Sequence, residues 1–161
     1  GDDGTMYILD AGMNALLSWT ADGGLETVTA WPENPVPTAI EIADNGDMYI
    51  GFLGAGLAPG AGVVEKWSGG ELVATYGGMT AVTDILLVDD TLYAVELFAL
   101  TEQGPGPGRV VMVTEDGPTP VVEGLLAPFS LAMGPDGALY VSYGTIAFAP
   151  GMTGGVVKVE M

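Results

Sequence analysis

The sequence predicts an all-β fold built from a repeated set of short strands. Four tyrosines, Tyr7, Tyr49, Tyr93 and Tyr140, each follow a turn that contains Asp, and they are 42, 44 and 47 residues apart. Repeats of about 40–50 residues that consist of short strands are typical of the blades of a β-propeller. The spacing therefore predicts a β-propeller.

Glycine and proline argue against helical repeats of similar length. The chain has 26 Gly and 11 Pro, which interrupt nearly every stretch that could form a helix. Helical repeats need a 3.6-residue apolar period over long stretches. The four acidic turns fit the β interpretation, because Asp, Asn and Gly are the residues that tight turns between strands require.

The second repeat contains a complete blade. Its strands are expected at residues 37–43, 48–53, 62–67 and 71–77, all of which are short and rich in β-branched or aromatic residues. The turn between the first two strands has the sequence DNGD, in which Gly46 can adopt a positive φ. The third strands of the other repeats align with it, at residues 14–19, 108–113 and 155–161.

This alignment predicts a single partial domain of about three and a half four-stranded blades, at approximately residues 1–35, 36–78, 79–126 and 127–161. The first blade lacks its first strand, and the last blade lacks its outer strand. Because propellers close with about 4–8 blades, we expect the C-terminal part of a larger ring of about six or seven blades. Upstream sequence or a second chain would supply the rest. A four-bladed ring that closes on itself is the alternative.

Charge and composition exclude several functions. The chain has 21 Asp and Glu against 3 Lys and Arg, a net charge of -18, so it should repel nucleic acids and anionic lipid. It has no Cys and no His, which excludes thiol nucleophiles, Ser-His pairs and the usual zinc sites. No apolar run reaches the roughly 18 residues of a membrane span. The acidic surface suits a secreted or extracytoplasmic protein, or one that collects divalent cations.

Two stretches resemble a known family. Residues 37–67, PTAIEIADNGDMYIGFLGAGLAPGAGVVEKW, and residues 128–161, PFSLAMGPDGALYVSYGTIAFAPGMTGGVVKVEM, resemble the ScyD/ScyE family of NHL-like propeller proteins. The family pattern has a D-G turn that leads into L-Y-V, followed by an apolar Pro/Gly insertion and G-x-V; the second stretch has D-G and L-Y-V, and the first has N-G and M-Y-I at these places. The resemblance covers nearly the whole chain. It implies a propeller fold and export from the cell, and it specifies no reaction.

The insertions between second and third strands predict an apolar surface. They lie at residues 54–62, 99–108 and 145–155, and in a propeller they share one face with the connections between blades. We call this the loop face. Its candidate binding residues for a protein or an apolar ligand are Phe52, Leu57, Leu97, Phe98, Ile146 and Phe148. The alternative is that these side chains only pack locally over the ends of the blades.

A calcium site is the second hypothesis. Asp84 and Glu96 are the candidate metal ligands, with Ser130 and Glu41 nearby, because calcium prefers oxygen ligands. They would belong to a calcium-dependent, lactonase-like hydrolase with most of its ligands outside this segment. The sequence offers few residues for acid–base chemistry. It therefore favours a non-catalytic, exported binding or assembly module that has no catalytic residues and needs no cofactor.

Overall fold

The computed structural model describes residues 1, 3–146, 151 and 153–160. These residues form sixteen strands and one short 3-10 helix, η1 (Ala55–Leu57). The all-β prediction is confirmed. The part of the chain that the structure describes contains no helix with the length and hydrophobicity of a membrane span.

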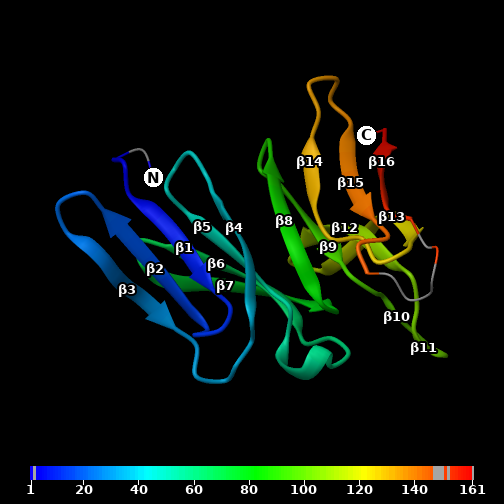
Figure 1. Cartoon of the computed structure of the whole chain (residues 1–161), viewed down its shortest axis with the longest axis horizontal. Coiled ribbons are helices and arrows are strands. Elements are labelled where there is room, and N and C mark those ends of the chain that lie inside the picture. The colour runs from blue at the N-terminus through cyan, green and yellow to red at the C-terminus, as the bar shows by residue number, and fades with distance from the viewer. Residues whose placement is uncertain (2, 147–150, 152, 161) are drawn as a thin grey trace.

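The strands form four antiparallel sheets that follow one another in sequence order (Figure 1). The first sheet contains β1 (Met6–Asp10), β2 (Ala15–Thr20) and β3 (Gly24–Ala30), and the second contains β4 (Pro37–Ile42), β5 (Met48–Phe52), β6 (Gly62–Ser68) and β7 (Glu71–Met79). The third contains β8 (Val82–Val88), β9 (Thr91–Glu96), β12 (Gly108–Thr114) and β13 (Gly117–Leu125), and the fourth contains β14 (Leu131–Met133), β15 (Leu139–Tyr143) and β16 (Gly155–Val159). A small hairpin of β10 (Leu100–Thr101) and β11 (Gly104–Pro105) is inserted between β9 and β12.

Glycines with a positive φ close the repeated turns. Gly4, Gly46 and Gly137 have φ values of 85°, 84° and 77°. The N–H group of each donates a hydrogen bond to the carbonyl oxygen three residues earlier, at 3.0, 2.8 and 3.0 Å. The third repeat differs, because Asp89 and Asp90 both have positive φ and form a two-residue turn between β8 and β9.

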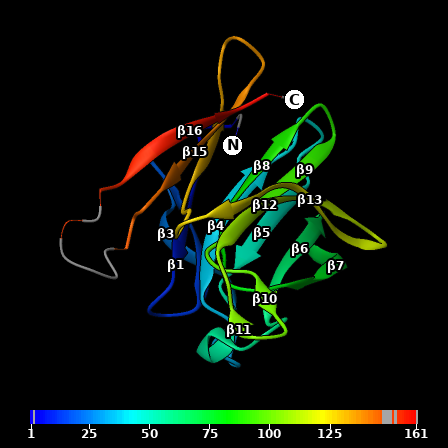
Figure 2. The same cartoon turned by 90° about the vertical axis from the view of Figure 1, so that its right-hand side faces the viewer.

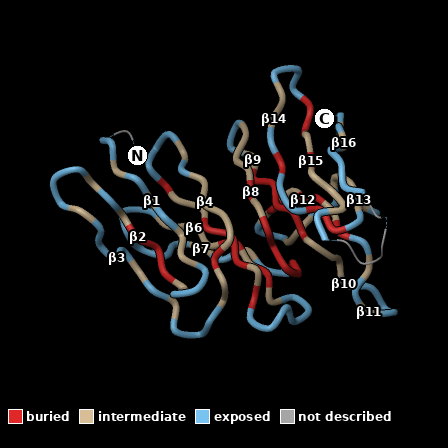
Figure 3. The backbone as a smooth tube through the Cα atoms, in the orientation of Figure 1, coloured by how far each residue is buried: buried red, intermediate tan, exposed pale blue. Residues whose placement is uncertain are grey.

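The hydrophobic core lies between successive sheets. One cluster joins the first and second sheets, another joins the second and third, and another joins the third and fourth. Their buried members include Leu16, Ile50 and Phe52 in the first cluster, Val64, Val82 and Val111 in the second, and Val95, Val110 and Val141 in the third. Figure 3 shows the buried segments along the strands and the exposed backbone at the hairpins.

The tyrosines that mark the repeat have a structural role in this packing. Tyr7 packs into the cluster between the first and second sheets, Tyr49 into the next cluster and Tyr93 into the last. Each of these three tyrosines therefore belongs to the cluster that joins its own sheet to the next. Each repeat of the sequence therefore forms one sheet, which packs against the sheet of the next repeat.

The outward side of the first sheet is apolar, and no other sheet of the described residues packs on it. We call this surface the first-sheet face. Its residues Met6, Ile8, Trp19 and Leu25 are 56%, 37%, 41% and 59% exposed. Met6 is paired across the strands with Trp19, just as Met48 is paired with Trp67 in the second sheet. There, the neighbouring Ile50 is fully buried by the first sheet. The first-sheet face therefore corresponds to the face of the second sheet that the first sheet covers.

The two ends of the sheets differ. The hairpins β4–β5 and β14–β15 project at one end, which we call the turn end (Figure 1). The 3-10 helix η1 and the β10–β11 hairpin both lie at the opposite end, as Figure 2 shows. That end carries the described insertions of the second and third sheets and the connections between sheets, so it is the loop face expected from the sequence.

Candidate functional site

An apolar pocket lies on the loop face. Its volume is about 560 Å³, within the range of roughly 300–1,000 Å³ that is typical of small-molecule sites. Its lining residues, which define the loop-face pocket, are Leu57, Leu97, Phe98, Pro105, Gly106, Pro107, Leu126, Ala127 and Ile146. Every lining residue is either glycine or has an uncharged, apolar side chain.

Three successive sheets contribute to the loop-face pocket. Leu57 is the last residue of η1, in the insertion of the second sheet. Leu97 follows β9, and residues 105–107 form the return limb of the β10–β11 hairpin, both in the third sheet. Leu126 lies in the connection between β13 and β14, and Ile146 follows β15 of the fourth sheet. The pocket therefore depends on how these sheets pack together.

Backbone hydrogen bonds hold the pocket wall in place. The Leu97 N–H group donates to the Ala81 carbonyl oxygen at 3.0 Å. Ala99 donates to Pro107 at 3.0 Å and accepts from the Gly106 N–H group at 2.9 Å, which fixes the hairpin limb. The Ala127 carbonyl oxygen accepts from the Thr145 hydroxyl group at 2.9 Å. These polar groups are satisfied within the protein, so the pocket presents mainly apolar surface to a ligand.

The structure brings together four of the six residues proposed for the loop face. Leu57, Leu97, Phe98 and Ile146 all line the pocket. Phe52 does not reach this surface: it is fully buried between the first and second sheets, with its ring 4.9 Å from that of Trp31 in an edge-to-face arrangement. Phe148 lies outside the described residues.

Glu96 forms a buried ion pair beside the pocket. Its side chain is almost completely inaccessible, and its carboxylate accepts hydrogen bonds from the Thr80 N–H group at 2.6 Å and from Nε of Arg109. Arg109 also lies 3.9 Å from Glu123. Sequence reasoning missed Arg109. The sequence contained one indication of its importance, because Arg109 is the only arginine among the three basic residues of the chain.

Asp84 links the strands β8 and β14. Its Oδ2 atom accepts hydrogen bonds from the Ser130 hydroxyl group at 2.5 Å and the Leu131 N–H group at 3.0 Å, and its Oδ1 atom accepts from the Ile85 N–H group at 3.0 Å. The structure thus joins Asp84 and Ser130, which the repeat places at equivalent positions. Both carboxylate oxygen atoms of Asp84 accept hydrogen bonds from protein groups. Because two of the donors belong to Ser130 and Leu131, Asp84 connects the third sheet to the fourth.

Glu41 lies on β4, the strand of the second sheet that packs next to β8. Partial burial and the negative charge of Asp84 raise its pKa, and a hydrogen bond from the Leu87 backbone opposes this increase only in part. Glu96 is engaged elsewhere, with Arg109 and Thr80. Within the described ranges, no group of three or more acidic side chains is placed to hold a metal ion.

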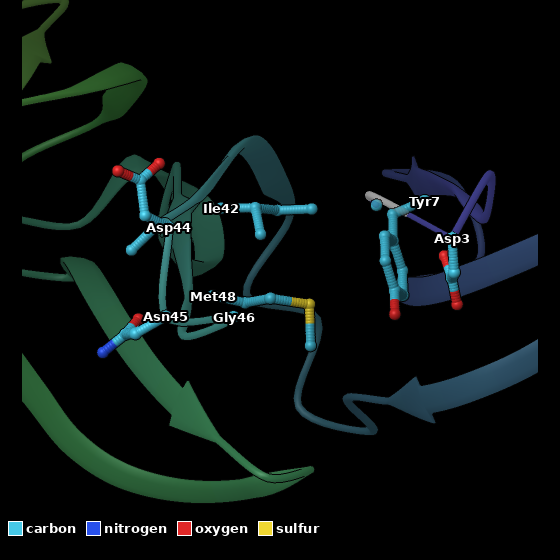
Figure 4. Close-up of a pocket in the computed structure, with 9 residues that line it drawn as sticks. Asp3, Tyr7, Ile42, Asp44, Asn45, Gly46 and Met48 are labelled. Atoms are coloured by element: carbon cyan, nitrogen blue, oxygen red, sulfur yellow. The ribbon is translucent and has the colours of Figure 1, made fainter.

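A second pocket opens at the turn end between the first and second sheets, with a volume of about 620 Å³. Figure 4 shows Ile42 and Met48 pointing toward Tyr7 across the gap, while Asp44 and Asn45 point away from it. A similar polar gap separates the turns of the second and third sheets. Because these gaps recur where successive sheets diverge, they follow from the packing of the scaffold.

The basic side chains are all paired with acidic ones. Lys66 lies 2.9 Å from Asp47, Lys158 lies 3.0 Å from Asp136, and Arg109 contacts Glu96. The Lys158 ion pair, with help from the Tyr140 hydroxyl group, lowers the pKa of Asp136 to about 2. Since the chain has only these three basic side chains, its unpaired surface charge is acidic.

The comparisons with solved structures identify the fold. The chain matches a virginiamycin B lyase from Staphylococcus aureus over 98% of its own length and 52% of that chain, with 15% identity and a TM-score of 0.65. A quinupristin-bound, catalytically inactive histidine-to-alanine variant of that lyase matches over 99% and 53%, with 17% identity and a TM-score of 0.65. A streptogramin B lyase matches over 100% and 57%, with 16% identity and a TM-score of 0.59.

The chain has the β-propeller fold. It spans about half the length of the solved structures that it matches. At this level of identity the likeness concerns the fold alone. No protein-family model and no curated protein sequence matches the chain.

Proposed function

We propose that this chain forms part of a non-catalytic β-propeller binding module that holds an apolar ligand or partner group in the loop-face pocket. The observation that carries this proposal is the pocket itself, in which apolar side chains from three successive sheets surround about 560 Å³. Leu57, Leu126 and Ile146 are each about two-fifths exposed there, so a ligand would remove apolar surface from water.

The sequence contains no histidine, so a histidine-dependent activity would need a residue from outside these 161 residues. The lyase from Staphylococcus aureus is described as catalytically inactive when one histidine is replaced by alanine. The present 161 residues contain no histidine and cannot supply such a group. A calcium-dependent hydrolase would also need most of its ligands from elsewhere, because Asp84 and Glu96 already accept hydrogen bonds from protein donors.

We further propose that the four sheets correspond to about three and a half blades of a larger ring of about six or seven blades. The proposed blades are residues 1–35, 36–78, 79–126 and 127–161. Two observations support the larger ring: the matched structures are about twice as long, and the first-sheet face is apolar and exposed. Light scattering of the chain alone, with and without a charge on that face, tests this proposal.

Export and membership of a ScyD/ScyE-like family remain proposals that rest on the sequence resemblance and on the acidic surface. The expected result for export is recovery of the full-length protein outside the cytoplasm. Fractionation of cells that express it with its natural N-terminal sequence tests this. Recovery in the cytoplasm alone would contradict the proposal.

A leucine pair tests the binding site. Leu126 lines the pocket and is 42% exposed, whereas Leu72 lies on β7 away from it and is 48% exposed. Leu126→Asp should weaken binding of the neutral dye Nile red about tenfold, because the ligand must then desolvate a carboxylate. Leu72→Asp should leave the affinity unchanged. Fluorescence titration measures both, with circular dichroism to confirm that each variant folds.

Two results would contradict the proposed site. Equal affinities of the wild-type chain and Leu126→Asp would show that the dye binds elsewhere. An equal loss in both leucine variants would show that the dye responds to general surface charge.

A further inference from the structure

The charge around the loop-face pocket favours one sign of ligand. None of its lining residues is charged, and each of the three basic side chains of the protein is held in an ion pair with a carboxylate. The remaining acidic groups give the chain a net charge of -18. A summed field of this kind attracts cations and repels anions, most strongly at low ionic strength.

The pocket wall itself cannot accommodate an ion. The Leu97 N–H group, both backbone groups of Ala99 and the Ala127 carbonyl oxygen are occupied by internal hydrogen bonds, and the lining side chains have no polar atoms. Removing a charged group from water into such a site without a partner is very costly. A ligand that carries a charge must therefore keep its charged end at the rim, in water, while its apolar part fills the pocket.

A carboxylate is available beside one wall. Glu102 is exposed in the turn that joins β10 to β11, and the return limb of this hairpin forms the pocket wall at Pro105, Gly106 and Pro107. The hairpin is fixed to the pocket by the hydrogen bonds of Ala99 with Pro107 and Gly106. Glu102 is therefore three residues along the chain from Pro105 of the pocket wall, in the same short hairpin.

We propose that the ligand of the loop-face pocket is an amphipathic cation, with an aliphatic group in the pocket and a positively charged group at the acidic rim. This rests on the proposed binding function and adds the chemical class of the ligand to it. The aliphatic part supplies affinity in proportion to its length, because each buried methylene strengthens binding about fourfold. The charged part supplies selectivity against anionic amphiphiles of the same length.

A matched set of eight-carbon ligands tests the proposal. Octylammonium, octanol and octanoate share one chain and differ in charge, so isothermal titration calorimetry at low ionic strength separates the two contributions. We expect octylammonium to bind about tenfold more tightly than octanoate, with octanol between them. At high ionic strength, where the Debye length falls to about 3 Å, the difference should nearly disappear.

Two controls identify where the selectivity arises. Glu102→Gln should weaken octylammonium about twofold and leave octanol unchanged, whereas Glu71→Gln, an exposed change on β7, should affect neither. Methylammonium carries the same charge without the chain and should show no saturable binding. If it bound as tightly as octylammonium, the attraction would be diffuse and the proposal would be wrong.

The remaining outcomes separate this inference from the function on which it rests. If the three eight-carbon ligands bound with equal affinity, the charge preference would be wrong while the pocket would stand. If none of them bound, and Nile red did not bind either, the binding function itself would be wrong.

Discussion

Replacing Glu96 with alanine is expected to lower the free energy of unfolding by about 3 kcal/mol. The change removes the acceptor of the Thr80 N–H group and leaves Arg109 without its buried partner. The Arg109 side chain is only 20% exposed, so water replaces the lost carboxylate poorly. Urea unfolding followed by circular dichroism measures the difference between the variant and the wild-type chain.

Glu96→Gln is the matched control. It retains an oxygen acceptor for Thr80 and loses the negative charge, so we expect an intermediate loss of stability. An unfolding free energy for Glu96→Ala within about 0.5 kcal/mol of the wild-type value would mean that the ion pair contributes little. Glu96 would then be free for another role, such as the metal ligand considered from the sequence.

The chain alone is expected to self-associate through the first-sheet face. Met6, Ile8 and Trp19 expose apolar surface, whereas their equivalents in the second sheet, Met48, Ile50 and Trp67, pack in the cluster between the first two sheets. Covering a few hundred Å² of such surface contributes several kcal/mol at about 25 cal/mol per Å². Light scattering at physiological ionic strength should therefore give a mass above the 16.4 kDa of one chain.

A charge on the first-sheet face should reverse the association. Ile8→Glu places a carboxylate at the centre of the face and should shift the chain toward the monomer, with a change in mass at equal protein concentration. Ala21→Glu adds the same charge in the exposed turn between β2 and β3 and should have no such effect. A stable monomer with a cooperative thermal melt for the wild-type chain would contradict the larger-ring proposal.

Much of the fold could be predicted because local chemistry determines it. The turn glycines and the β-branched strands of the second repeat predict four strands, and the observed β4, β5, β6 and β7 end within two residues of the expected positions. The period of the tyrosines predicts the packing of successive sheets, because Tyr7, Tyr49 and Tyr93 each belong to the cluster between their own sheet and the next. Spacing alone left the number of blades in the full ring undetermined.

The candidate site was less predictable because exposure depends on packing between distant segments. Phe52 and Phe98 both end or follow a second strand, yet Phe52 is buried against Trp31 while Phe98 lines the pocket. That difference arises because Trp31, from the end of the first repeat, covers the end of β5. The β10–β11 hairpin was expected as a loop, since its Gly and Pro residues give no strand signal.

The most direct test of the proposed function is to map where a ligand binds. Octylammonium titrated into chain labelled at its isoleucine and leucine methyl groups should shift the NMR signals of Leu57, Leu97, Leu126 and Ile146 with a single saturable curve. Signals from the first-sheet face and the turn-end pocket should remain unchanged. Shifts centred on either of those surfaces, or small shifts spread over the whole acidic surface, would contradict the assignment of the loop-face pocket as the binding site.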